Sequence, residues 1–215
     1  IAGAASLLNE SDTEEERAEM LSMLQRNLRR VTQMLTQLLD YSRLESGQEQ
    51  FLNGEFDTTV VLQELITGLQ PTADGQGLFL RGNGPATLPV QGDAVKFDRI
   101  AQNLILNALN YTERGGVTVD WTLNETANQW TFSVADTGPG LPAPLIAMLT
   151  DTAGVEADQS TGTNGVQSSV SISTGEGIGL FIVKRLCDLL GSQINVSCKP
   201  GKGTLIEIKL PLTYS

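Results

Sequence analysis

The stretch Asn103-Leu104-Ile105-Leu106-Asn107-Ala108-Leu109-Asn110-Tyr111 carries the most informative pattern of this sequence. It ends an apolar run whose spacing predicts a helix over Phe97–Tyr111. Asn103, Asn107 and Asn110 recur at i, i+4 and i+7, so their carboxamides share one stripe of that helix. Asparagine is a poor helix former, but its oxygen is a good ligand for a Mg²⁺ ion that also keeps water and nucleotide phosphates. The alternative is that the stripe is the solvent-facing side of an amphipathic helix.

A turn with two glycines, Asp136-Thr137-Gly138-Pro139-Gly140, directly follows an apolar strand pattern. A carboxylate at a strand end accepts a hydrogen bond from an exocyclic amino group such as that of adenine, and Gly138 and Gly140 let a flat ring approach the backbone. An ordinary tight turn is the plainer interpretation. Asp-Thr-Gly is also found in aspartic proteases, which need two such aspartates, so with one copy that function requires a symmetric dimer.

Glycines alternate in Gly175-Glu176-Gly177-Ile178-Gly179-Leu180, which runs into a helix predicted over Ile178–Leu190. Exposed backbone N–H groups and the positive end of the helix favour phosphate oxygens. The spacing is not that of a dinucleotide-binding fingerprint, and the lysine of a P-loop is missing. A flexible hinge is the alternative.

Hydrophobic periodicity predicts short strands alternating with helices after Phe51, which favours an α/β sandwich. The predicted helices cover Val60–Leu69, Phe97–Tyr111 and Ile178–Leu190, and the predicted strands cover Leu88–Gln91, Val117–Leu123, Gln129–Ala135, Gln193–Lys199 and Thr204–Leu210. Val117–Leu123 pairs with Gln129–Ala135 in one predicted hairpin, and the last two strands form another. Ala143–Thr150 holds no phenylalanine, and we expect the Ser-, Thr- and Gly-rich stretch from Thr150 to Thr174 to be a mobile lid.

An apolar seam precedes this region and consists of Leu21, Leu24, Leu28, Val31, Leu35 and Leu38. Its spacing is that of a coiled coil or four-helix bundle, and Ser11 and Glu14 form a capping box at its start. Gly47 stands where the helix would stop. Residues 1–8 resemble the end of an antiparallel partner helix, so a helical hairpin is predicted. Pairing of two hairpins in a dimer would bury the seam, and a hairpin packed on its own domain is the alternative.

Together, the order and spacing of these motifs resemble the sensor histidine kinases, members of the gyrase-type ATP-binding superfamily. The matching segments are Asn103–Ala108 with Tyr111–Thr112 (the N box), Asp136–Gly140 and Gly175–Leu180 with Ile182–Arg185 (two glycine boxes), Gly201–Thr204 (the last glycine box) and Leu38–Gly47 (the end of the second dimerisation helix). Five motifs in the family order exclude the protease. The resemblance implies an α+β chain, with a dimerisation helical hairpin over residues 1–50 and an ATP-binding α/β sandwich over residues 51–215.

The resemblance also implies roles for individual residues around ATP and Mg²⁺. Asn107 would bind Mg²⁺ with help from Asn103, and Asp136 would accept the adenine amino group. The remaining expected nucleotide contacts are Asn110, Tyr111, Gly138, Gly140, Gly175, Gly177, Gly179, Leu180 and Thr204, with the three alternating glycines over the phosphates and Thr204 acting through water. ATP-hydrolysing relatives carry a glutamate at the position of Asn103. Asparagine cannot accept a proton from water, so bound ATP should persist for a better nucleophile.

The chain departs from the family pattern in its charges. Asn110 stands where the family usually has a lysine, and no Lys or Arg occurs from Gly115 to Val183, a stretch that carries seven acidic residues. Lys184, Arg185 and Arg114 are the nearest candidate cations. We therefore expect weak ATP affinity that depends strongly on Mg²⁺.

The composition excludes several other functions. Twenty-five acidic against 14 basic residues give a net charge of −11, which argues against nucleic-acid binding. No apolar run approaches the roughly 20 residues of a membrane span, so no membrane contact is expected of this segment. Two cysteines allow one disulfide at most and favour a reducing, cytoplasmic setting, which includes the cytoplasmic part of a membrane-bound sensor.

The expected function is therefore that of a histidine kinase. The γ-phosphoryl group of ATP would pass to a histidine and then to an aspartate of a response-regulator receiver domain, with the protein acting as a homodimer through its N-terminal helices. The sequence holds no histidine, so by the family pattern the acceptor lies upstream of Ile1. One alternative is a catalytically weak regulatory module or a phosphatase acting on a response regulator. A serine kinase of the anti-sigma-factor kind shares the ATP fold but would not explain the N-terminal seam.

Overall fold

The computed structural model divides the chain into two compact units, Ile1–Gln48 and Glu49–Ser215. It describes residues 50–150, 177–199 and 201–214, together with Arg17, Met20, Leu21, Met23, Leu24, Asn27, Leu28, Val31, Thr32 and Ser42 of the first unit. The predicted capping box, Gly47, the partner helix and the lid after Thr150 lie outside the described residues.

All the described residues of the first unit are helical. Three of its large apolar side chains are open in the single chain, since Leu21 is 52% exposed, Leu28 62% and Val31 39%. These residues belong to the predicted seam. An uncovered apolar stripe of this kind fits association with another helix, and the dimer stays a prediction.

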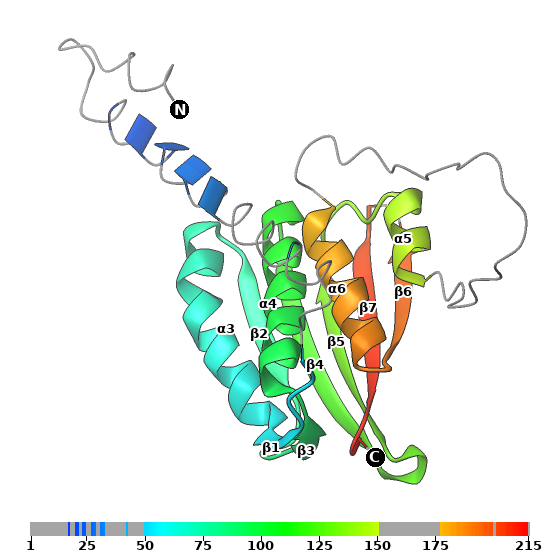
Figure 1. The fold of residues 1–215 in the computed structure, drawn as a ribbon. Coiled ribbons are helices and arrows are strands. Elements are labelled where there is room, and N and C mark those ends of the chain that lie inside the picture. Colours follow the sequence, from blue (N-terminus) through cyan, green and yellow to red (C-terminus); the bar gives the residue numbers. More distant parts are fainter. Residues whose placement is uncertain are drawn as a thin grey trace, which may run out of the picture. The chain divides into compact units, whose positions relative to one another are not determined.

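The second unit is a two-layer α/β sandwich. Its elements are β1 (Gly54–Asp57), α3 (Thr58–Gly75), β2 (Phe79–Asn83), β3 (Pro89–Gly92), α4 (Ala94–Tyr111), β4 (Gly116–Asn124), η1 (Glu125–Ala127), β5 (Gln129–Asp136), α5 (Ala143–Thr150), α6 (Ile178–Leu189), β6 (Gln193–Lys199) and β7 (Gly203–Pro211). The main sheet has the strand order β2-β4-β5-β7-β6, and β1 pairs with β3 in a separate ribbon. Helices α3, α4 and α6 lie on one face of the sheet (Figure 1). The predicted α+β fold with an α/β sandwich is confirmed.

The predicted hairpins are also confirmed, because β4–β5 and β6–β7 are both antiparallel pairs. The helix predicted over Val60–Leu69 is shorter than the observed helix α3. Helix α3 begins at Thr58, where the side chain of Asp57 accepts a hydrogen bond from the Thr59 amide at 2.8 Å, and it continues through Pro71 to Gly75. The sequence patterns missed β1, β2 and α5.

The apolar side of α4 packs against the middle of the sheet. The Phe97 ring makes edge contacts with Trp130 at 4.9 Å and Phe132 at 5.4 Å between ring centroids, and all three side chains are buried. Trp130 and Phe132 are two residues apart on β5, so they face the same side of the sheet. This packing fixes α4 over β5, and the last two turns of α4 therefore lie beside the turn that follows β5.

Candidate functional site

A cavity of about 240 Å³ lies between the last turns of α4, the end of β5, α5, α6 and β7. Its lining consists of Leu104, Asn107, Ala108, Tyr111, Val134, Asp136, Pro139, Gly140, Leu141, Pro142, Leu145, Leu180, Thr204 and Ile206. The cavity thus gathers residues from each of the motifs around Asn107, Asp136, Leu180 and Thr204. Asp136 is the one charged residue in that lining, and the other side chains are mostly apolar.

The carboxylate of Asp136 is held by two backbone amides. Its Oδ1 accepts hydrogen bonds from Gly138 N at 2.8 Å and Thr204 N at 3.2 Å. Its Oδ2 has no hydrogen-bond partner among the described residues, although Asp136 lines the cavity. The first bond closes the turn after β5, and the second ties that turn to β7. One oxygen therefore fixes the side chain and the other stays available to a donor.

Glycines make the close approach of these segments possible. A Cβ on Gly138 would lie 3.0 Å from Asp136 Oδ1 and 3.1 Å from the Tyr111 carbonyl oxygen. Gly203 has a φ of +103°, and a Cβ there would overlap the Asp136 carbonyl oxygen. Positive φ and this lack of space both favour glycine. Gly138 thus has a second effect besides leaving space for a ring, because its amide orients the Asp136 carboxylate.

The three asparagines of the α4 stripe differ in their position relative to the cavity. Asn107 lines the cavity, and its Nδ2 is buried without a hydrogen-bond partner. Asn103 is buried, is not part of the lining, and donates from Nδ2 to the Arg99 carbonyl oxygen at 2.8 Å. Asn110 is exposed and also lies outside the lining, whereas Tyr111 forms part of it. All three asparagines lie on α4, but only Asn107 of the three lines the cavity.

The predicted phosphate turn is described from Gly177 onward, and Gly175 lies outside the described residues. Gly177 is the N-cap of α6 and supplies no side-chain cap, so the first backbone N–H groups of the helix keep their bonding capacity. Gly179 and Leu180 are buried in the first turn, and Leu180 reaches the cavity. A helix N-terminus thus stands at the cavity, as the glycine pattern predicts.

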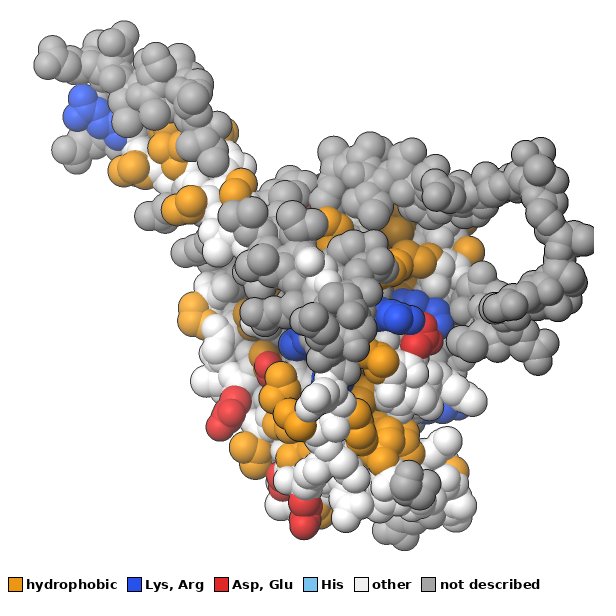
Figure 2. Space-filling view, viewed as in Figure 1, with side chains coloured by type: hydrophobic (Ala, Val, Ile, Leu, Met, Phe, Trp, Pro, Cys, Tyr) orange, Lys and Arg blue, Asp and Glu red, His pale blue; other side chains and the backbone are white. Residues whose placement is uncertain are grey.

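The candidate cations do not line the cavity. Lys184 forms an ion pair with Asp188 one turn along α6, and Arg185 and Arg114 are exposed. Among the described residues drawn in Figure 2, Lys and Arg side chains form small separate patches on that face of the molecule. Any anion in the cavity would therefore depend on backbone amides, on the helix end or on a bound cation.

Asn107 fits a Mg²⁺ ion through its carboxamide oxygen, whereas its buried Nδ2 calls for a hydrogen-bond acceptor such as a phosphate oxygen. A buried amide without a partner is unfavourable, and a carboxamide also carries a ligand oxygen. Mg²⁺ binds through few protein oxygens when it keeps water and phosphate ligands. Within the described residues there is no cluster of three His, Cys, Asp or Glu side chains that would hold a metal ion alone. The site therefore fits a cation that arrives with a phosphate ligand.

Helix α5 contributes a wall of the cavity that the sequence patterns missed. Leu145 lies in its first turn, and Leu141 and Pro142 directly precede it. A proline at a helix start is a sequence signal for this helix. The Leu141 amide donates to Sγ of Cys198 on β6 at 3.2 Å, a contact without any sequence signal.

Cys187 and Cys198 are free thiols, and burial raises the pKa of Cys187. The disulfide that the sequence allowed is thus absent.

Two family models match the chain. The model described as "Histidine kinase-, DNA gyrase B-, and HSP90-like ATPase" matches residues 92–214, and the model described as "His Kinase A (phospho-acceptor) domain" matches residues 1–47. The first match covers more than half of the chain and includes every residue of the cavity lining.

No helix in the described part of the chain has the length and hydropathy needed to cross a membrane.

Curated relatives are similar over nearly the whole chain. The autoinducer 2 sensor kinase/phosphatase LuxQ of Vibrio cholerae is 29% identical over 99% of this chain and 24% of its own length. The sensor protein GacS of Pseudomonas syringae is 29% identical over 98% of this chain and 23% of its own length. The histidine-protein kinase BarA of Escherichia coli is 28% identical over 86% and 20%, respectively. The chain thus spans about a quarter or less of these relatives.

Solved structures share the fold. ShkA in complex with AMPPNP aligns with a TM-score of 0.68 at 23% identity, over 99% of this chain and 42% of that chain. The Acinetobacter baumannii histidine kinase AdeS aligns with a TM-score of 0.65 at 18% identity, over 98% of this chain and 90% of that chain. The family model that matches residues 92–214 shows that the chain belongs to the family of histidine kinase-, DNA gyrase B- and HSP90-like ATPases, and the curated relatives LuxQ and BarA are named as kinases.

Proposed function

We propose that the second unit binds ATP with its adenine ring in the cavity and its amino group on Asp136. The observation that carries this proposal is the carboxylate at the end of β5, with Oδ1 held by two amides and Oδ2 left to a donor between apolar walls. Asp136 is partly exposed, so Oδ2 is accessible to a donor that enters the cavity. The adenine amino group supplies the donor, and the flat ring fills the apolar space.

The phosphates would lie toward Asn107 and the first turn of α6. A cavity of about 240 Å³ is below the range of about 300–1,000 Å³ typical of pockets that enclose whole ligands. We therefore assign the base to the cavity and the phosphates to its mouth. Asn107 would hold Mg²⁺ with assistance from Asn103, and the ion would neutralise phosphate charge that no lining Lys or Arg meets. Gly175, Gly177 and Gly179 would cover the phosphates, Gly140 would border the base, and Thr204 would support it through water.

The whole protein would then be a sensor kinase that acts as a homodimer in the cytoplasm. Its first unit matches a phospho-acceptor domain, and the relatives LuxQ and BarA are named as kinases. The γ-phosphoryl group would move to a histidine outside these 215 residues and then to a response-regulator aspartate. The structure of ThkA with the response regulator TrrA, similar in fold, supports a partner of that kind. Positioning and electrostatics would supply most of the catalysis.

The test is a transfer assay on the natural protein extended upstream to include an acceptor histidine. With γ-labelled ATP and Mg²⁺, we expect acid-labile label on the protein that moves to an added receiver domain. Asp136→Ala should abolish the label, and Asp120→Ala should retain it, because Asp120 on β4 bonds to Asn83 away from the cavity. Labelling of the Asp136→Ala protein at the normal rate would contradict the proposal.

A regulatory module or phosphatase is the second candidate. It is favoured by the absence of Lys and Arg from the cavity lining and by the exposed Asn110 at the position of the family lysine. Such a protein would bind the nucleotide weakly and accelerate loss of phosphate from a phosphorylated receiver domain. The same assay separates the two, because the second candidate predicts no label on the histidine and faster loss from the receiver.

A further inference from the structure

A buried ion pair lies at the start of α4, outside the nucleotide cavity. Asp93 is the N-cap of α4 and Lys96 lies in its first turn. Asp93 is 2% exposed and Lys96 is 5% exposed, and Lys96 Nζ lies 2.9 Å from Asp93 Oδ2. Burying two charges is costly, and it is tolerated when hydrogen bonds satisfy their remaining polar atoms. The partners of those atoms therefore indicate what the pair does.

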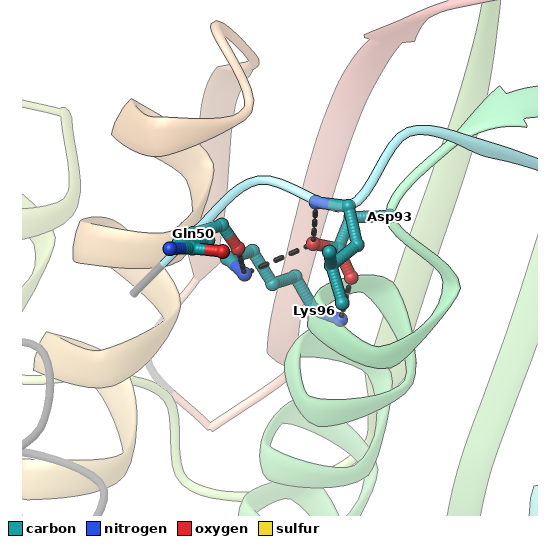
Figure 3. Close-up of polar contacts among 4 residues, drawn as sticks. Gln50, Asp93 and Lys96 are labelled. Atoms are coloured by element: carbon teal, nitrogen blue, oxygen red, sulfur yellow. Dashed lines mark hydrogen bonds and ion pairs between the residues drawn. The ribbon is translucent and has the colours of Figure 1, made fainter. Parts of the chain in front are cut away.

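Both charges bind the main chain at the beginning of the second unit. Lys96 Nζ donates to the Gln50 carbonyl oxygen at 2.7 Å, and the Leu52 amide donates to Asp93 Oδ2 at 2.9 Å. Asp93 Oδ1 accepts from the Lys96 amide at 3.0 Å and so caps the helix at the same time. Figure 3 shows Asp93 where the chain enters α4 and Lys96 in the first turn, with the Lys96 side chain extending to Gln50.

The end of the second unit meets the same segment. The ring of Phe51, between the two tethered residues, lies 4.9 Å from the ring of Tyr214. The Gln91 amide donates to the Leu212 carbonyl oxygen at 2.9 Å, which holds the C-terminal residues beside the strand that leads to Asp93. The segment that enters the unit and the segment that leaves it are thus fastened at one place.

We propose that Asp93 and Lys96 are positioning residues for phosphoryl transfer, because they fix the main chain at Gln50–Leu52 to the helix that carries Asn107. This inference rests on the proposed kinase function. Gln50 is the second residue of the second unit, so the pair fixes the beginning of that unit. Lys96 and Asn107 belong to the same helix, which Asp93 caps, so the main chain at Gln50 keeps a fixed place relative to Asn107. A displacement of about 1 Å at reacting groups can cost about 100-fold in rate.

The first experiment tests the tether in the chain of 215 residues. Lys96→Met removes the donor to Gln50, and Asp93→Asn combined with Lys96→Met removes both charges while it keeps an acceptor for the cap, so no buried charge is left alone. In the double variant, we expect hydrogen exchange of the Leu52 amide to accelerate at least about tenfold, with the dissociation constant of an ATP analogue within about twofold of wild type. Lys96→Arg, which keeps Asp93 and both charges, should leave exchange of the Leu52 amide slow.

The second experiment measures transfer in the natural protein extended to the acceptor histidine. The double variant should lower kcat for labelling at least about tenfold with KM for ATP unchanged, because the tether does not touch the cavity. Lys96→Arg, which keeps both charges, should retain most of the rate. Lys209→Met, which removes the same charge from β7, should change neither constant.

Three results would overturn the inference. The first is transfer at the wild-type rate by a folded double variant, and the second is a loss of nucleotide affinity parallel to the loss of rate, which indicates a structural role only. The third is unchanged exchange at Leu52. A wild-type protein that binds ATP but labels no histidine overturns the proposed kinase function instead, and with it the positioning role, even when Leu52 stays protected.

Discussion

The backbone amide of Thr204 lies 3.2 Å from Asp136 Oδ1, and this bond joins the last glycine motif to the first. The two residues are far apart in the sequence and meet because β5 and β7 are neighbours, with Ala135 opposite Leu205. The strand pairing thus orients the carboxylate before any ligand arrives. A preoriented acceptor loses little conformational entropy on binding.

Asp136→Asn should weaken nucleotide binding strongly. Asparagine keeps the shape and one acceptor, but it lacks the negative charge, and a hydrogen bond to a charged group contributes about 1.5–3 kcal/mol. The expected loss is therefore roughly 10- to 100-fold in the dissociation constant of a non-hydrolysable ATP analogue, measured by calorimetry. Asp120→Asn is the matched control. Equal affinities of the Asp136→Asn and wild-type proteins for the analogue would contradict a hydrogen bond between Asp136 and the nucleotide.

Asn107→Leu should stabilise the fold and impair the site. The change replaces a buried, unpartnered amide with an apolar side chain, so we expect the free energy of unfolding to rise by about 1 kcal/mol and the melting temperature by about 2–4 °C. Binding of the Mg²⁺–nucleotide complex should fall at least about tenfold. Asn103→Leu is the comparison, because it breaks the bond to Arg99 and should bring no gain in stability. A destabilised Asn107→Leu protein would contradict the assignment.

Gly203→Ala and Gly201→Ala form a matched pair. Both glycines have positive φ, +103° and +70°, but a Cβ on Gly201 meets nothing within 4 Å, whereas one on Gly203 overlaps the Asp136 carbonyl oxygen. Gly201→Ala should cost about 1 kcal/mol of stability from backbone strain alone. Gly203→Ala should cost at least about 2 kcal/mol and also displace Asp136, so analogue binding should fail. Thermal unfolding and calorimetry measure both effects, and equal effects of the two substitutions would show that the contact is unimportant.

The fold was predictable from the sequence where hydrophobic periodicity is strong. The long apolar run of α4 and the alternating residues of β4, β5 and β7 specify both element and buried face. Strand β2 was missed because Phe79–Asn83 is a short edge strand with an arginine, a glycine and an asparagine, and its parallel partner β4 lies far along the chain.

The site was predictable in part for a similar reason. The motifs around Asn107, Asp136 and Thr204 are local, and their resemblance to a family orders them around one nucleotide. Which asparagines of α4 reach the cavity depends on its wall, and the bond between Leu141 and Cys198 depends on two segments that meet only in the folded chain. Neither has a local signal in the sequence.

Stability at low pH should depend on Asp93. Burial raises the pKa of its carboxyl, but the hydrogen bonds from Leu52 and Lys96 together outweigh burial and hold the pKa below its usual value. A lowered pKa contributes stability above the unfolded value near 3.8, and this stability is lost as the pH falls through the folded pKa. Between pH 5 and the acid transition, the wild type should therefore lose stability more steeply than Asp93→Asn.

Asp98 affects the pH dependence of stability in the opposite direction to Asp93. It must therefore be present in both proteins that are compared. Burial and the charge of Glu64 raise its pKa, so its contribution to stability improves as the pH falls. Because Asp98 is present in both proteins, their difference isolates Asp93. Parallel curves of unfolding free energy against pH would contradict the role of Asp93.

The most direct test of the account is calorimetric titration of residues 1–215 with a non-hydrolysable ATP analogue, with and without Mg²⁺. The account predicts binding that requires Mg²⁺, because no Lys or Arg lines the cavity and Asn107 in the lining carries a carboxamide oxygen that can ligate the ion. A folded protein that binds nothing at millimolar analogue would contradict the nucleotide site. Submillimolar binding without the metal would contradict the role of Asn107.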